Sequence, residues 1–166
     1  MRPPPQPEGA VAEVLFYHLT ETPLEAAIPP MLEASLKRGW AVVLRVGSPE
    51  RAAALNAHLW TYRDDGFLPH GGPADGPAAA QPIYVTAGEE VPNAPHVLML
   101  ADGAGADLTE FQTMPRTCLL FDARDPDAVQ AARVRWKEVT GAGLKAVYWK
   151  QDGGKWQKAA ESTPDA

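Results

Sequence analysis

The sequence predicts an α/β domain with a mostly parallel central sheet that is covered by helices on both faces. The chain has 166 residues, of which 45% are hydrophobic and 22% are charged, as is typical of one globular domain. Short runs of β-branched and aromatic residues alternate with segments whose apolar residues recur at helical spacing. Because parallel strands need a crossover between them, usually a helix, this alternation favours a parallel sheet.

The first strand and helix are expected between residue 13 and Gly39. Residues 13–19 form a short run rich in aromatic and branched side chains, which is typical of a buried strand. Thr22 is a suitable N-cap for the helix that follows, and apolar residues then recur at helical spacing until Gly39. Pro29 and Pro30 each lack a backbone donor, so we expect a kink or a late start in this helix.

A strand, a helix and a long irregular segment follow. The second strand is expected over 40–46, and the second helix starts within 47–50 and runs to about Trp60. Residues 63–82 are rich in Gly and Pro and show no periodic pattern. Loops of about 20 residues inside compact domains are often functional, so this segment is a candidate binding region.

The second half of the chain adds four strands and one long helix. The strands are expected over 83–87, 96–101, 117–122 and 144–151. Asp125 followed by Pro126 is typical of the cap and first position of a helix, which is expected from about 125 to 140. Gly153-Gly154 then turns the chain into a short amphipathic tail.

A single domain is expected over residues 13–160, between a flexible Pro-rich segment at 1–12 and a flexible tail at 161–166. Cys118 is the only cysteine, which excludes an intrachain disulfide and suits a reducing cytoplasm. The first residues lack the apolar region of a secretory signal, and no run approaches the roughly 18 apolar residues of a membrane span. We therefore expect a cytoplasmic protein.

Charge is distributed unevenly along the chain. The formal net charge is −6, which weighs against a large duplex-DNA footprint, because phosphate binding needs clustered Lys and Arg. From residue 124 onward, in contrast, 8 basic side chains outnumber 6 acidic ones. This locally basic quarter fits either one acidic partner segment or a simple scatter of charge.

A small α/β enzyme or nucleotide-binding protein is the first alternative, because parallel sheets often bind nucleotides at the carboxyl ends of their strands. Gly47 and Gly103-Ala104-Gly105 follow predicted strands and are where such a ligand would bind. Leu108 stands where a dinucleotide fingerprint needs its third glycine, which favours an ordinary turn. The sequence has no P-loop, no serine in a nucleophile motif and no histidines at metal-ligand spacing. We therefore expect no catalytic residue, no cofactor and no metal site.

Aromatic and apolar residues gather around the start of the long irregular segment. Trp60 ends the second predicted helix, and Phe67, Leu68, Pro69 and His70 follow within the loop. A satellite cluster that pins the loop to the core would have this composition. A protein interface with aromatic anchors would have it as well.

The last long helix carries a second candidate surface. One face, defined by i, i+3, i+4 spacing, carries Val129, Arg133, Trp136, Lys137 and Thr140. Two cations are thereby set beside an indole ring. A solvated basic face near a helix C-terminus would look like this, as would a pocket for an acidic peptide with an apolar tip.

Six short motifs, in their order and spacing, make the chain resemble a known family. They are Leu15-Phe16-Tyr17, Leu55-x-x-x-Leu59-Trp60-Thr61-Tyr62, Phe67-Leu68-Pro69-His70-Gly71, Phe121-Asp122, Ala132-Arg133-x-Arg135-Trp136-Lys137 and Tyr148-x-x-Gln151. With them, the sequence resembles the chi subunit family of bacterial DNA polymerase III holoenzyme from about residue 13 to 160. The resemblance implies a Rossmann-like three-layer α/β domain without catalytic activity.

The resemblance also implies partners and the residues that bind them. A chi subunit is an accessory protein of the clamp loader that binds the psi subunit and the acidic C-terminal tail of single-stranded-DNA-binding protein, and so contacts nucleic acid only indirectly at the replication fork. The implied psi surface consists of Trp60, Phe67, Leu68, Pro69 and His70. The implied tail pocket consists of Val129, Arg133, Trp136 and Lys137. Trp136 stands where Tyr is also found in the family, and Val129 where a basic residue can occur, which implies a weaker pocket.

Overall fold

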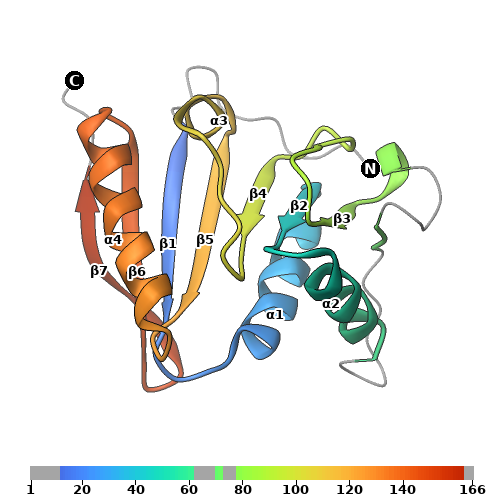
Figure 1. Cartoon of the computed structure of the whole chain (residues 1–166), viewed down its shortest axis with the longest axis horizontal. Coiled ribbons are helices and arrows are strands. Elements are labelled where there is room, and N and C mark those ends of the chain that lie inside the picture. Colours follow the sequence, from blue (N-terminus) through green and yellow to red (C-terminus); the bar gives the residue numbers. More distant parts are fainter. Residues whose placement is uncertain (1–11, 62–69, 73–77, 163–166) are drawn as a thin grey trace.

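The described part of the chain is built around one seven-stranded sheet (Figure 1). The computed structural model describes residues 12–61, 70–72 and 78–162. In chain order the elements are β1 (Glu13–Leu19), α1 (Leu24–Lys37), β2 (Val42–Arg45), α2 (Pro49–Thr61), a 3₁₀ turn (Ala78–Ala80), β3 (Ile83–Thr86), β4 (Val97–Leu100), α3 (Leu108–Thr113), β5 (Arg116–Asp122), α4 (Pro126–Gly141), β6 (Lys145–Asp152) and β7 (Lys155–Ser162). No helix within these ranges is long and apolar enough to cross a membrane.

The strands lie in the order β3-β2-β4-β5-β1-β6-β7. All neighbouring pairs from β3 to β6 are parallel, and only β7 pairs in the antiparallel direction, with β6. The prediction of a mixed α/β domain with a mostly parallel sheet is therefore confirmed. In the dinucleotide-binding order 3-2-1-4-5-6, β1 lies beside β2. Here β1 lies between β5 and β6, and Glu13 is opposite both Arg116 and Lys145.

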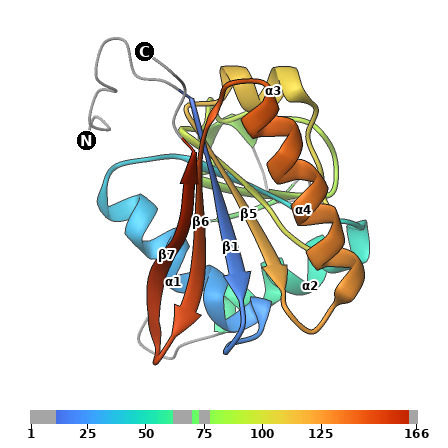
Figure 2. The same cartoon turned by 90° about the vertical axis from the view of Figure 1, so that its left-hand side faces the viewer.

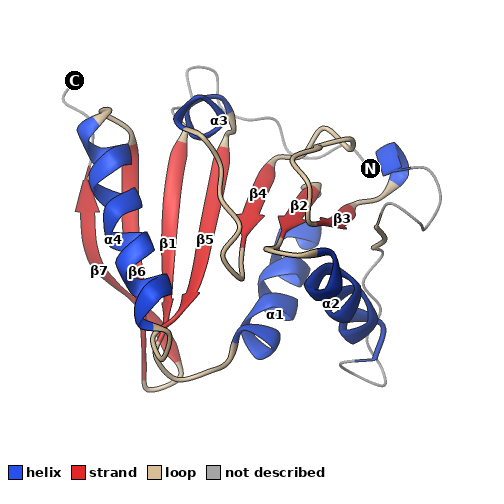
Figure 3. Cartoon of the chain, in the orientation of Figure 1, coloured by secondary structure: helices blue, strands red, loops and turns tan. Residues whose placement is uncertain are grey.

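Helices cover both faces of the sheet (Figures 2 and 3). They bury two separate sets of apolar side chains. On one face, α1 and α2 pack over alternate residues of the strands, such as Leu15 and Leu44. On the other face, α3 and α4 pack over the residues between them, such as Phe16 and Val43. The parallel strands are buried on both faces, which explains why they appear in the sequence as almost continuous apolar runs.

Pro29 and Pro30 lie inside α1, which begins at Leu24. The late start that the two prolines led us to expect is therefore wrong. Pro29 lacks the N–H that would bond the carbonyl of Glu25 one turn before it. His58 of α2 replaces that donor, since its ring Nε2 lies 3.0 Å from the Glu25 carbonyl oxygen. A side chain from a neighbouring helix therefore compensates one of the lost bonds. The expected Thr22 cap is wrong, because the N-cap is Pro23 and no side chain caps the helix.

The helix α3 was not expected from the sequence. Asp107 is its N-cap and accepts a hydrogen bond from the backbone N–H of Glu110 at 2.8 Å. An acidic cap followed three residues later by Glu is a known helix-start signal, but it stands here before only six helical residues. A helix this short depends on its packing, and Phe111 provides this by being fully buried.

The amphipathic tail expected after Gly153-Gly154 is wrong, because residues 155–162 form the edge strand β7. Of the flexible tail expected over 161–166, residues 163–166 lie outside the described residues. Gly153 and Gly154 both have positive φ values, 61° and 79°, which is the geometry of a two-residue hairpin turn that matches strand twist. β7 then pairs with β6 as far as Ser162, two residues past the expected domain end. Most of its side chains are exposed, so it lacks the apolar run that marked the other strands.

Candidate functional site

The helix α4 presents the predicted basic face at the surface. Arg133 and Lys137 are both exposed. Neither side chain forms an ion pair or a hydrogen bond with another residue in the described part of the chain. The neighbouring Arg135, in contrast, pairs with Glu138 at 3.2 Å. Two cations on this face are therefore available to a ligand.

The apolar residues of this face form a floor between the cations. Trp136 is half-buried, and its ring meets Phe16 edge-on with centroids 5.3 Å apart and Tyr148 with centroids 5.9 Å apart. Val129 also packs against the core cluster beneath α4. We name the surface made by Val129, Arg133, Trp136 and Lys137 the α4 surface. The structure thus brings together all four residues predicted for the tail pocket.

Residues of β1 and β6 lie next to the α4 surface. Lys150 is exposed and lies beside His18 in the pairing of β1 with β6. Burial lowers the pKa of His18, and the charges of Lys150 and Arg133 lower it further. The two cations therefore act on one imidazole, whose Nδ1 lies 2.8 Å from the Tyr148 hydroxyl. Sequence periodicity within α4 does not reveal Lys150, because its place depends on the register between two strands.

The second predicted surface starts at the end of α2. Trp60 is 53% exposed, and its ring centroid lies 4.4 Å from that of His70. His70 itself is buried, and its Nε2 donates to the carbonyl of Asn56 at 3.0 Å. The next residue, Gly71, pairs with the edge strand β3 through backbone bonds. His70 thus supports Trp60 from below and is not itself available on the surface.

Three of the residues predicted for this surface, Phe67, Leu68 and Pro69, lie outside the described residues. Of the predicted psi surface, the structure describes Trp60, which is exposed, and His70, which is buried against it. We name the exposed Trp60, with the buried His70 that supports it, the α2 surface.

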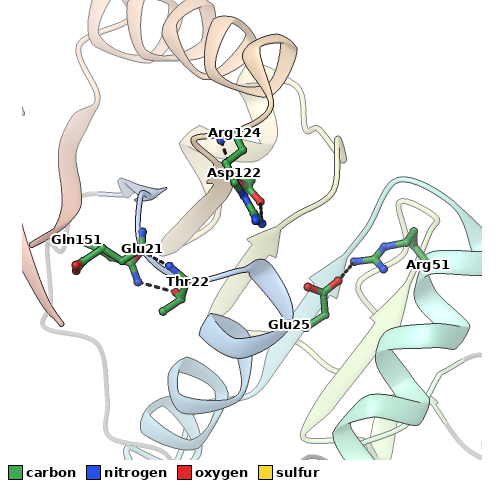
Figure 4. Close-up of polar contacts among 7 residues, drawn as sticks. All are labelled: Glu21, Thr22, Glu25, Arg51, Asp122, Arg124 and Gln151. Carbon is green, nitrogen blue, oxygen red and sulfur yellow. Dashed lines mark hydrogen bonds and ion pairs between the residues drawn. The ribbon is translucent and has the colours of Figure 1, made fainter. Parts of the chain in front are cut away.

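A cavity of about 620 Å³ lies at the carboxyl ends of the parallel strands. This is where α/β sheets commonly bind ligands. Arg51 at its rim contacts Glu25 at 2.7 Å and Asp102 at 3.1 Å. Arg124 contacts Asp122 at 2.8 Å (Figure 4). A phosphate group would have to displace these carboxylates, so the cavity gives the nucleotide-binding alternative no specific support.

Gln151, from the last family motif, stabilises a loop at this edge (Figure 4). Its side-chain oxygen accepts the backbone N–H groups of Glu21 and Thr22 at 2.9 and 3.2 Å. Its amide nitrogen donates to the Thr22 hydroxyl at 2.7 Å. Gln151 therefore joins the end of β6 to the connection between β1 and α1, which is a structural role.

Cys118 lies in the middle of the sheet. Burial raises the pKa of its thiol to about 12, so the thiolate that a nucleophile needs does not form at neutral pH. Cys118 therefore acts as a small buried apolar residue of the sheet.

Comparison with known proteins decides the family. A family model described as "DNA polymerase III chi subunit, HolC" matches residues 11–147, which run from the start of β1 into β6. The chain belongs to the DNA polymerase III chi subunit family. This confirms the resemblance found in the sequence and makes the chain a member of a family of polymerase accessory subunits.

A relative with a similar sequence agrees with membership of the chi family. The "Probable DNA polymerase III subunit chi" of Rickettsia prowazekii (strain Madrid E) is 32% identical over 85 residues, which cover 51% of this chain and 52% of that protein. The chain therefore matches about half the length of this relative. Trp60 and the four residues of the α4 surface lie within the chi family match, whereas Lys150 and β7 lie beyond it.

Proposed function

We propose that the chain is an adaptor in the DNA polymerase III assembly, in the cytoplasm at the replication fork. In this proposal the α2 surface binds the psi subunit, together with Phe67, Leu68 and Pro69. The α4 surface binds the acidic C-terminal tail of single-stranded-DNA-binding protein. The adaptor does no chemistry of its own and contacts DNA only through its protein partners.

The observation that carries the proposal is the composition of the α4 surface. A tail with aspartates, a final apolar side chain and a free carboxylate needs an apolar contact and several cations. Trp136 and Val129 supply the apolar floor, and Arg133 and Lys137 lie at its edge, with no carboxylate partner among the residues that the structure describes. The planar guanidinium of Arg133 can bind two carboxylate oxygens at once, whereas Lys137 acts as a point charge.

The separation of the two surfaces also supports a bridging role. α2 packs beside β3 at one edge of the sheet, whereas α4 packs over β5 and β6 towards the other edge (Figure 1). The two helices also lie on opposite faces. Two partners can therefore bind at the same time without contact between them.

Arg133→Glu is expected to weaken binding of the tail peptide at least about tenfold, because a charge-assisted bond becomes a repulsion. The measurement is a fluorescence-anisotropy titration with the C-terminal peptide of single-stranded-DNA-binding protein from the same organism. Affinity should also fall as NaCl rises, since exposed charges are screened within about 8 Å at physiological ionic strength.

The matched control is Lys37→Glu, which makes the same charge reversal at an exposed position on α1, on the other face of the sheet. It should leave peptide affinity close to that of the wild type. Equal affinities of wild type and Arg133→Glu, or affinity that does not change when the last residue of the peptide is removed, would rule out the α4 surface as the tail site.

Trp60→Ala is expected to weaken psi binding by about 2 kcal/mol, as truncation of an aromatic anchor commonly does. Surface plasmon resonance with the psi subunit measures this. Val134→Ala is the matched control, since Val134 is 55% exposed but lies on α4. Both variants should melt close to the wild type. Unchanged psi affinity in Trp60→Ala would remove the α2 surface from the proposed interface.

A further inference from the structure

A second, smaller cavity lies on the opposite face of the sheet from the α4 surface, under the C-terminal half of α1 (compare α1 and α4 in Figure 2). Its volume is about 180 Å³. Aromatic and sulfur-containing side chains dominate its walls, namely Tyr17, Met31, Trp40, Met99, Cys118 and Trp156. We name it the α1 pocket.

Two arginines border the α1 pocket. The guanidinium carbons of Arg38 and Arg116 each lie 4.9 Å from the ring centroid of Trp40. Arg116 is paired with Glu13 at 2.7 Å. Arg38 is exposed and has no ion pair or hydrogen bond from its side chain among the described residues. The rim of an apolar pocket thus holds one uncompensated positive charge.

Trp40 offers a further polar group. Its indole N–H is buried and has no acceptor within the described part of the chain. A buried donor without a partner is unfavourable, and an incoming acceptor that bonded it would relieve this cost. An anionic oxygen at this position could accept from the indole and lie near the Arg38 guanidinium, so the polar groups favour a carboxylate.

The size of the pocket limits what it can hold. Pockets for cofactors and drug-sized ligands usually measure about 300–1,000 Å³, so 180 Å³ is too small for a nucleotide. It has room for one large side chain. Aromatic walls and polarisable sulfur atoms favour an apolar or aromatic side chain over a polar one.

From this combination we infer that the α1 pocket binds one large apolar side chain of a partner protein, presented next to an aspartate or glutamate whose carboxylate meets Arg38 and Trp40. The occupant is an internal acidic segment, because one carboxylate beside one apolar side chain is all that the pocket and its rim require. The site is separate from both proposed surfaces, since it lies on the other face of the sheet from α4 and neither Trp60 nor His70 lines it.

The test follows the five tryptophan indole N–H signals in ¹H–¹⁵N NMR spectra of the full chain, assigned by single Trp→Phe variants. The probe is the tripeptide acetyl-Asp-Phe-Asp-amide. We expect a saturable shift of the Trp40 signal and no matching shift of the Trp136 signal. Acetyl-Asn-Phe-Asn-amide and acetyl-Asp-Ala-Asp-amide, which lack the charge and the apolar side chain respectively, should each bind at least about tenfold more weakly.

Arg38→Glu should abolish the Trp40 shift, and Lys37→Glu, the adjacent exposed residue on α1, should keep it. Binding that is equal for the charged and neutral tripeptides, or that survives Arg38→Glu, would overturn the inference. So would an absence of any Trp40 shift up to the solubility limit of the probe. A Trp40 signal that moves on dilution of the protein alone, or on removal of residues 163–166, would assign the pocket to a second copy or to the chain's own end and would equally overturn it. Because the tail peptide is tested separately, by anisotropy with Arg133→Glu, failure here leaves the α4 proposal standing, and the reverse also holds.

Discussion

Phe16→Ala should lower the free energy of unfolding by about 3–5 kcal/mol, as removal of a fully buried Phe commonly does. Phe16 lies on β1, which has a neighbouring strand on each side, and its side chain is completely buried. Its ring contacts Trp136 and also stacks near Tyr148, with centroids 6.3 Å apart. Equilibrium unfolding in urea, with the midpoint and slope fitted together, measures the change.

The same variant tests how the α4 surface is supported. Phe16→Leu keeps most of the apolar volume and should cost less than about 1.5 kcal/mol. If Phe16→Ala folds, the ring of Trp136 loses its contact with Phe16. The affinity of Phe16→Ala for the tail peptide should therefore fall further than that of Phe16→Leu. A loss in stability below about 1 kcal/mol would contradict the central packing role assigned to Phe16.

Glu110→Gln should destabilise the fold by about 3 kcal/mol, because it removes the carboxylate that pairs directly with a buried arginine. The pKa of Glu90 is lowered first by a backbone hydrogen bond and also by the charge of the same arginine, with which Glu90 interacts only at longer range. Arg45, at the end of β2, is only 3% exposed. Its two terminal nitrogens donate to the two carboxylate oxygens of Glu110 at 2.7 and 2.9 Å. Arg45 also donates to the backbone carbonyls of Glu89 and Gly105, so the pair holds together two loops and α3. Urea unfolding again provides the measurement.

The control for this variant is Glu138→Gln, which makes the same substitution in the more exposed pair with Arg135. Exposed i, i+3 pairs contribute only about 0.3–0.5 kcal/mol, so this change should be barely measurable. Similar effects of the two substitutions would show that burial of Arg45 does not set the strength of its pair.

The parallel strands could be predicted within one or two residues because burial on both faces makes each of them an apolar run. β2, expected over 40–46, was found at Val42–Arg45, and β5, expected over 117–122, at Arg116–Asp122. α4 was equally clear, since Asp125 caps it and Pro126 begins it. In these elements, local composition and tertiary environment favour the same structure.

The features that were missed depend on contacts between distant parts of the chain. α1 continues through Pro29 because His58, from another helix, bonds a carbonyl that the proline leaves without a donor. α3 is short and depends on the burial of Phe111 and the pair between Glu110 and Arg45. In the candidate site, spacing within one helix grouped Arg133 with Trp136 and Lys137. It could not find Lys150, whose place is decided by strand register.

The central position of β1 has a consequence for how the protein forms during synthesis. Of the described strands, β1 is the first to be synthesised, yet its two neighbours in the sheet are β5 and β6. His18 on β1 and Tyr148 on β6 are 130 positions apart in the sequence. At translation rates of about 5–20 residues per second, this apolar strand waits for several seconds before its partners exist. Nascent chains that stop before β5 should therefore be substrates for chaperones, and native structure around β1 should appear only after β5 and β6 have been made.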